Sequence, residues 1–179
     1  DESGHGLANQ GWKDSGDSMR FRDGSVAAAP IALVEAQAYA VEAATDAAAL
    51  LRALGDEDGD DALAQSLGTW SVSLASRIRD HFWVGEGGRR YLAMAVDGER
   101  RAVDGVGSNM GHVLGTGALT AGEARDVTAT LTGPTMLGRF GIATMATDNG
   151  GFNPVGYHTG SVWVHDTAIC ALGMAREGH

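Results

Sequence analysis

The chain has 179 residues, of which 44% are hydrophobic and 20% charged, a composition that excludes a disordered or fibrous protein. Its 23 acidic and 13 basic residues give a net charge of −10, which disfavours nucleic acid and anionic membrane surfaces as partners. Cys170 is the only cysteine, so no internal disulfide can form. No apolar run approaches the roughly 20 residues that span a bilayer. We therefore expect one domain over residues 1–179 and a cytoplasmic location.

The first two predicted elements are long helices. Pro30 suits the first turn of a helix, and the alanine-rich run that follows it reaches Gly55, which suits a C-terminal cap. Apolar residues recur at three- and four-residue spacing between 61 and 82, and this pattern predicts a second helix. The acidic segment 55–61 is short enough to make the two helices a hairpin.

Shorter elements follow along the chain. Residues 89–100 predict a short strand with a reversal at Asp97-Gly98, and 108–119 predict a helix weakened by glycines. Thr120 and Glu123 have capping-box spacing, so 120–131 predict a clearer helix. Five glycines make 141–160 a structured loop, and a last helix is expected from about Ser161. This organisation predicts an all-α fold of helical hairpins with a small β-hairpin insertion, arranged as part of a toroid or as a simple bundle.

The opening segment NQGWKDSGD, 9–17, is unusually rich in reactive side chains. Trp12 offers a flat apolar face, Asp14 and Asp17 offer carboxylates, and Lys13 offers a cation. Sugars need this mixture, because their C–H faces stack on aromatic rings while their hydroxyls require donors and acceptors. A carboxylic acid beside an indole is also desolvated, which raises its pKa toward neutrality. Alternatively, the aspartates cap a turn and Trp12 packs into the core.

A second group of candidate residues lies in the segment GFNPVGYHTGSVWVHD, 151–166. Its chemically useful side chains are Tyr157, His158, Trp163, His165 and Asp166. Together with His112, three of these are plausible metal ligands: His158, His165 and Asp166. Their spacing matches no established zinc motif, so we predict neither a metal nor a cofactor. A Ser161-His165-Asp166 relay is weaker still, because Ser161 lacks the strand-to-helix elbow that exposes a serine nucleophile.

Two further pairs of polar residues lie at predicted helix starts. Asn109 and His112, three residues apart, could share a helix face and donate to a ligand hydroxyl, or they could cap the helix and pack. Glu35 and Gln37 pose the same choice near the start of the first helix.

Taken together, four segments in order resemble the catalytic region of bacterial amylo-α-1,6-glucosidases, also called glycogen debranching enzyme-like proteins. These segments are GLANQGWKDSGDSM, APIALVEAQAYAVEAA, SNMGHVLGTG and GFNPVGYHTGSVWVHDTAICALGMAREG. The resemblance covers most of the chain except roughly 55–105. It implies an (α/α)6 barrel shared with glucoamylase-like, trehalase-like and glucosylglycerate hydrolase-like enzymes. The pocket of such a barrel cleaves α-glycosidic bonds with inversion, so the expected partner is an α-glucoside or oligosaccharide.

The resemblance also assigns roles to residues. It makes Asp14 the general acid and places Tyr157, His158, Trp163, His165 and Asp166 on the pocket wall, while Val164 replaces a proline that is common in the family. The family's general base lies in a downstream Pro-Glu-Leu motif that would come after His179, so we expect a partial barrel that holds only the acid. Two alternatives stay open: Glu35 or Asp166 acts as the base, or the chain is a half-barrel that binds carbohydrate without catalysis. Exposed helix faces would make such a half-barrel a possible homodimer.

Overall fold

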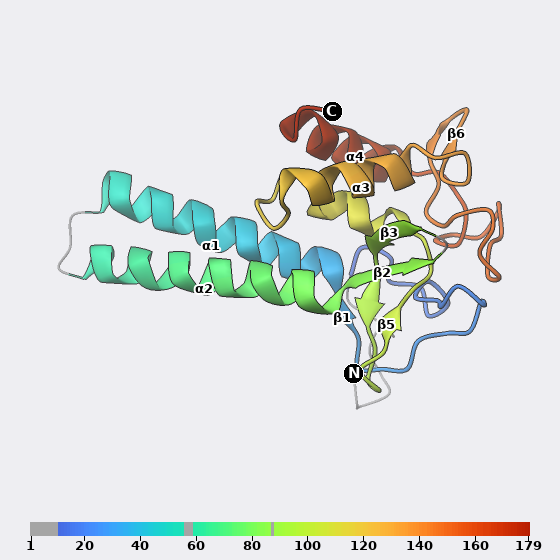
Figure 1. Cartoon of the computed structure of the whole chain (residues 1–179), viewed down its shortest axis with the longest axis horizontal. Coiled ribbons are helices and arrows are strands. Elements are labelled where there is room, and N and C mark those ends of the chain that lie inside the picture. The colour runs from blue at the N-terminus through green and yellow to red at the C-terminus, as the bar shows by residue number, and fades with distance from the viewer. Residues whose placement is uncertain (1–10, 56–58, 87) are drawn as a thin grey trace.

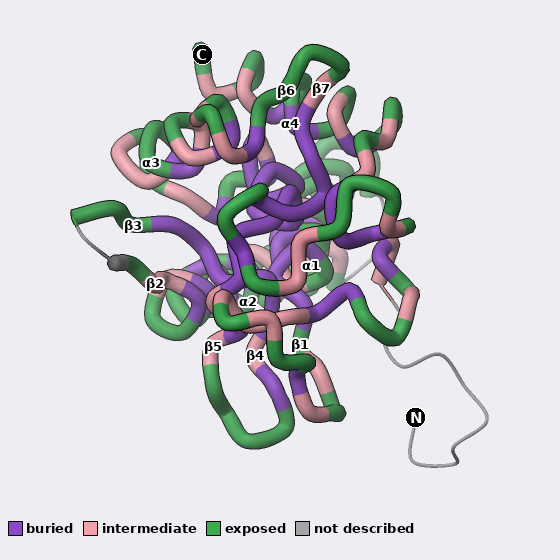
Figure 2. Tube along the Cα trace, turned by 90° about the vertical axis from the view of Figure 1, so that its right-hand side faces the viewer, coloured by how far each residue is buried: buried purple, intermediate pink, exposed green. Residues whose placement is uncertain are grey.

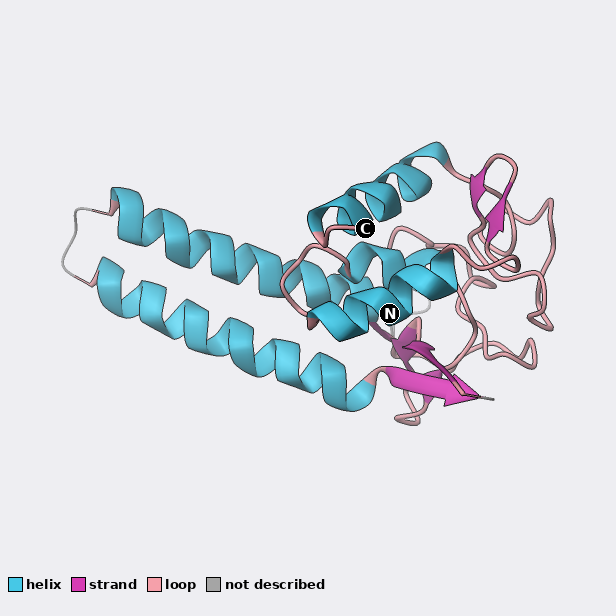
Figure 3. Cartoon of the chain, turned by 45° about the horizontal axis from the view of Figure 1, so that its top comes forward, coloured by secondary structure: helices cyan, strands magenta, loops and turns pink. Residues whose placement is uncertain are grey.

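A computed structural model describes residues 11–55, 59–86 and 88–179. Within these residues the fold is mainly helical, with a few very short strands. Figure 1 shows a long antiparallel pair of helices that extends from a body of shorter elements and loops. The strands are confined to that body, on the side away from the far end of the hairpin (Figure 3). The predicted helical fold is therefore confirmed, with more β-structure than the single hairpin we expected.

The long pair consists of α1 (Val34–Leu54) and α2 (Asp60–His81). Buried residues of α1, among them Val34, Ala38 and Val41, pack in one apolar cluster with residues of α2 such as Leu74 and Ile78. The helix predicted between 61 and 82 is confirmed. None of the described helices is long and apolar enough to cross a membrane.

The predicted start of the first helix at Pro30 is wrong. Ala32–Leu33 form strand β1, which pairs antiparallel with β4 (Ala95–Val96), and α1 begins only at Val34. This pairing joins residues more than sixty positions apart, and the local sequence pattern carries no signal for it. β5 (Ala102–Val103) completes a three-stranded sheet in the order β1-β4-β5.

The remaining strands form two hairpins. β2 (Trp83–Glu86) pairs with β3 (Arg89–Leu92), and β6 (Leu137–Gly138) pairs with β7 (Gly141–Ile142). The reversal predicted at Asp97 is confirmed: its Oδ1 accepts hydrogen bonds from the backbone N–H groups of Glu99 and Arg101, at 3.0 and 2.8 Å.

Three short helices complete the body. The segment predicted as a weak helix from 108 is a fully buried 3-10 helix, η1 (Ser108–Val113). α3 (Ala121–Leu131) has the predicted capping box between Thr120 and Glu123, and α4 (Val164–Arg176) begins three residues after the expected Ser161. η1 passes so close to α4 that a Cβ at Gly111 would clash with Cys170 Sγ. Figure 2 shows the buried residues of the chain in purple, gathered mainly in the interior of the body.

Candidate functional site

Two segments that are about 145 residues apart face each other in the structure. The hydroxyl of Ser15 is hydrogen-bonded to Nδ1 of His158 at 2.9 Å. The ring of Trp12 meets those of His158 and His165 edge to face, with centroids 5.3 and 5.0 Å apart, and that of Trp163 at 6.5 Å. The structure thus brings together the two segments that the sequence singled out.

The aromatic side of this site has exposed ring surface. Tyr157, which is 63% exposed, packs edge to face on His158 and Trp163 with centroids 4.5 and 4.8 Å apart. Trp163 donates from Nε1 to the carbonyl oxygen of Tyr157 at 2.8 Å and to Oγ of Ser161 at 3.0 Å. These bonds fix the indole, and His165 beside it is also exposed. Aromatic rings with accessible faces are what a sugar stacks on.

Beneath Trp12 lies a buried histidine-aspartate pair. His112 stacks on the indole, with centroids 5.6 Å apart and planes 9° from parallel, and its Nε2 is 2.8 Å from Oδ1 of Asp166. Its Nδ1 is hydrogen-bonded to the hydroxyl of Tyr39. Burial, followed by the Glu35 carboxylate, raises the pKa of Tyr39 to about 12. We did not predict a site role for Tyr39, although its place four residues after Glu35 puts both on one helix face.

Lys13 forms the centre of a second buried network. Its side chain is completely buried and donates from Nζ to Oδ1 of Asn109 at 2.8 Å and to the carbonyl oxygen of Thr144 at 2.6 Å. Asn109 in turn donates from Nδ2 to Oε1 of Glu35 at 2.9 Å. Burial lowers the pKa of Lys13 to about 8, although the carboxylates of Asp166 and Glu35 oppose this effect. The cation of the opening segment thus anchors that segment and is not offered to solvent.

The two aspartates of the opening segment are on the surface, so the desolvation expected for an acid beside Trp12 is not found. Asp14 is exposed, and Asp17 is exposed and lies 3.8 Å from the guanidinium of Arg20. Burial and the charge of Lys13 lower the pKa of His158, while the carboxylates of Asp14 and Asp17 act on the same ring in the opposite direction. Both carboxylates therefore lie near the aromatic cluster, where a bound molecule could reach them.

The structure does not bring Gln37 to this site. A two-residue step turns about 200° around a helix, so Gln37 and Glu35 point to nearly opposite sides of α1. Gln37 lines a separate cavity of about 460 Å³ together with residues of α2 and β4.

The alternative catalytic assignments are not supported by the geometry. Ser161 Oγ bonds to the carbonyl oxygen of Tyr157 and to the indole of Trp163, and Asp166 bonds to His112, so the Ser161-His165-Asp166 relay is not formed. Glu35 and Asp166 are both buried, and each uses one carboxylate oxygen in a hydrogen bond. Their other oxygens are buried without a partner among the described residues. Neither acid is open to a water molecule that it would have to activate.

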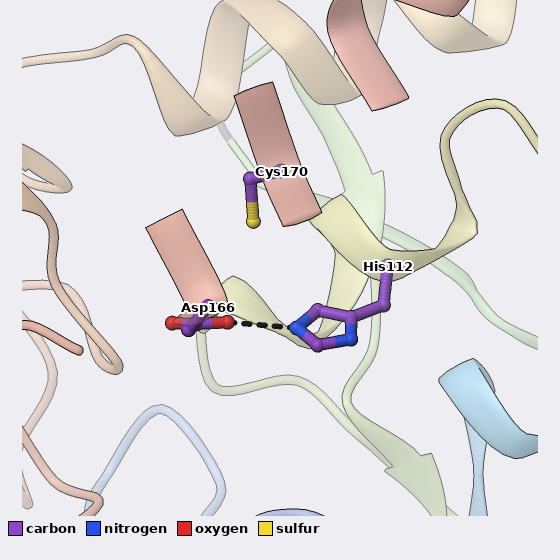
Figure 4. Close-up of side chains that lie close together, drawn as sticks. All are labelled: His112, Asp166 and Cys170. Atoms are coloured by element: carbon purple, nitrogen blue, oxygen red, sulfur yellow. Dashed lines mark hydrogen bonds and ion pairs between the residues drawn. The ribbon is translucent and has the colours of Figure 1, made fainter. Parts of the chain in front are cut away.

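A possible set of metal ligands exists, but it is not the one considered from the sequence. Among the described residues, atoms of His112, Asp166 and Cys170 lie within 4.8 Å of one another, and Figure 4 shows Asp166 facing His112 with Cys170 further along α4. Burial raises the pKa of the Cys170 thiol to about 12, although the positive charge of Lys13 nearby acts to lower it. A protonated thiol beside an ammonium suits a cation poorly. The arrangement fits a hydrogen-bonded histidine-aspartate pair better.

Comparison with known proteins shows which family the chain is similar to and which solved structure has a similar fold. The family described as "Mannosylglycerate hydrolase MGH1-like glycoside hydrolase domain" matches residues 5–179. Among solved structures, the chain is similar to neutral trehalase Nth1 from Saccharomyces cerevisiae, with a TM-score of 0.65 and 16% sequence identity. The match covers 92% of this chain and 31% of the trehalase, so the chain spans about a third of that enzyme's length. No curated protein matches. A glycoside hydrolase family and a trehalase-like helical fold are thus shown, and the narrower amylo-α-1,6-glucosidase resemblance is not.

Proposed function

Because the chain belongs to the mannosylglycerate hydrolase MGH1-like glycoside hydrolase domain family, we propose that it hydrolyses α-glucosidic bonds with inversion, as amylo-α-1,6-glucosidases do. The observation that carries this proposal is the aromatic cluster around Trp12, with the exposed carboxylates of Asp14 and Asp17 beside it. Stacking surfaces next to acids are the combination that sugar chemistry requires. Nε1 of Trp12 has no hydrogen-bond partner among the described residues, which leaves it as a donor for a ligand hydroxyl.

We assign the general acid to Asp14. It follows Trp12 by two residues, and it is the exposed acid next to Lys13, which anchors the segment. In this role Asp14 protonates the glycosidic oxygen while Trp12, Trp163 and Tyr157 hold the sugar ring. An inverting enzyme also needs a base, roughly 6.5–9.5 Å from the acid, that activates water on the opposite face of the sugar. Since Glu35 and Asp166 are closed to solvent, we propose that the base comes from a segment outside residues 1–179.

The test uses the protein together with the segment that supplies the proposed base, and it compares Asp14→Asn with Asp46→Asn, which removes another exposed carboxylate, from α1. Loss of the general acid should lower turnover of unactivated α-glucosides by about 10²-fold or more, as is typical of general acid catalysis. Turnover of α-glucosyl fluoride should fall much less, because fluoride leaves without protonation. The Asp46 variant should match the parent protein. Unchanged hydrolysis by Asp14→Asn would remove Asp14 from this role.

The substrate and the stereochemistry are tested on a panel of isomaltose, trehalose, glucosylglycerate and mannosylglycerate. Inversion predicts that β-glucose appears first when product release is followed by NMR. Turnover of mannosylglycerate alone would exclude the α-glucoside assignment, while α-glucose as first product would exclude inversion.

A non-catalytic half-barrel that self-associates is the second candidate, because the α1-α2 pair exposes large apolar residues. Leu54 is 77% exposed and Val72 70% exposed, and Leu50, Leu63 and Trp70 are also exposed. Such surfaces favour association. This candidate predicts a homodimer in sedimentation experiments and a thermal shift with malto-oligosaccharides without released glucose. A monomer that releases glucose would exclude it.

A further inference from the structure

The separate cavity that Gln37 lines lies where the α1-α2 hairpin meets the small β1-β4-β5 sheet. Its volume is about 460 Å³, within the range of small-molecule sites. Leu74 and Ile78 of α2, with Phe82 directly after this helix, form a buried apolar floor. None of the residues that line it belongs to the aromatic cluster around Trp12. Its function is therefore independent of the glycosidase proposal.

The polar residues of this pocket are cationic or can donate hydrogen bonds. They are Gln37, Arg77, His81 and Arg100. Two acids that precede Arg100 in the turn are paired with Arg101 instead: the guanidinium of Arg101 lies 2.8 Å from the carboxylate of Asp97 and 3.2 Å from that of Glu99. Within the described parts of the chain, neither arginine of the pocket has an ion-pair partner. Two guanidinium groups that lack an ion-pair partner among the described residues therefore share one pocket, in a protein with a net charge of −10.

The backbone of Arg100 is held in an unusual conformation. Its φ of 63° makes it the one non-glycine residue of the described segments in the left-handed region, which is unfavourable for a residue with a Cβ. Asp97 closes the turn, because its carbonyl oxygen accepts from Arg100 N at 2.9 Å and its carboxylate accepts from Arg101 N at 2.8 Å. The turn thereby fixes the backbone of Arg100 beside the pocket.

We propose that this pocket binds a small organic anion. The carboxylate or phosphate of the ligand would lie between Arg77 and Arg100, with the amide of Gln37 as an additional donor, because guanidinium groups match both anions in geometry. The apolar body of the ligand would cover Leu74 and Phe82. An inorganic ion would leave this floor exposed, so an anion with an apolar body fits the pocket better.

The experiment titrates the 1–179 chain, labelled with ¹⁵N, with four probes: benzoate, phenyl phosphate, inorganic phosphate and benzyl alcohol. Saturable shifts of the Gln37 side-chain amide and the Arg100 backbone amide are expected with benzoate and phenyl phosphate. Benzyl alcohol should give none. Inorganic phosphate should bind at least about fivefold more weakly than the two organic anions. The stronger of the two organic anions identifies the preferred head group.

Three variants test the assignment. Arg77→Ala and Arg100→Gly should each weaken binding about fivefold, the effect of one partly exposed ion pair. Glycine accepts the left-handed backbone at 100, so this variant removes the cation without disturbing the turn. Arg125→Ala removes an exposed cation from α3 and should bind as the parent does. Absence of saturable shifts with both organic anions, equal binding of benzyl alcohol, or equal weakening by Arg125→Ala would each overturn the proposal.

Discussion

The buried ammonium group of Lys13 should make the stability of this protein rise with pH in the alkaline range. Burial lowers the pKa of Lys13 from its usual 10.5 to about 8. In the unfolded chain the side chain is solvated and keeps its usual pKa. Between pH 8 and 10.5 the unfolded state therefore holds a proton that the folded state has released, and the free energy of unfolding increases with pH. The difference of about 2.5 in pKa corresponds to about 3 kcal/mol.

Cys170 opposes this effect in part of the same range. Burial raises the pKa of its thiol from 9.0 to about 12, so the folded state keeps a proton that the unfolded state loses above pH 9. Stability attributable to Cys170 then falls with pH. We expect the free energy of unfolding of the unaltered chain to rise by about 1 kcal/mol between pH 8 and 9. It should then stay level between pH 9 and 10.5, because the opposite effects of Lys13 and Cys170 cancel.

Urea denaturation followed by tryptophan fluorescence, at intervals from pH 7.5 to 10.5, measures both terms. Cys170→Ala should show nearly the full rise of about 3 kcal/mol, less a small loss above pH 10 from the raised pKa of Tyr39. Addition of Lys13→Met should remove the rise. If Cys170→Ala shows no increase between pH 8 and 10, or if the double variant keeps the same slope, Lys13 does not carry a depressed pKa and the reasoning fails.

Three further predictions concern local contacts. Thr120→Ala removes the capping box of α3 and should lower the free energy of unfolding by about 1 kcal/mol in urea denaturation; no change would mean that the end of the helix is held by its tertiary contacts. Gly111→Ala places a methyl group against Cys170 Sγ and should cost about 1–3 kcal/mol, and Cys170→Ala in the same chain should recover part of this loss in thermal melts. Burial raises the pKa of Glu35, so its contribution to the free energy of unfolding should fall as pH rises above about 4.5. Glu35→Gln, whose side-chain oxygen can still accept a hydrogen bond from Asn109, should abolish that fall in urea denaturation at several pH values. The same pH profile in the parent and the variant would show that the pKa of Glu35 is not raised.

The sequence determined those features that depend on neighbouring residues. Apolar spacing placed α2 to within one residue at each end, and the Thr120 and Glu123 pair gave the capping box, because helix periodicity and end chemistry are local. The mixture of an indole, acids and a cation in the opening segment indicated a sugar site, and the ordered segments indicated a glycoside hydrolase family. The family match bears out that broader assignment.

Tertiary structure decided which of these side chains face solvent and which are buried. Lys13, predicted to offer a cation to a ligand, is instead enclosed by Asn109 and Thr144, which lie 96 and 131 residues away in sequence. Tyr39 belongs to the site because its hydroxyl is hydrogen-bonded to His112. Gln37 lies outside the site because Glu35 and Gln37 point to nearly opposite sides of α1. Burial and long-range hydrogen bonds depend on how distant segments pack, and no local pattern in a single sequence records that packing.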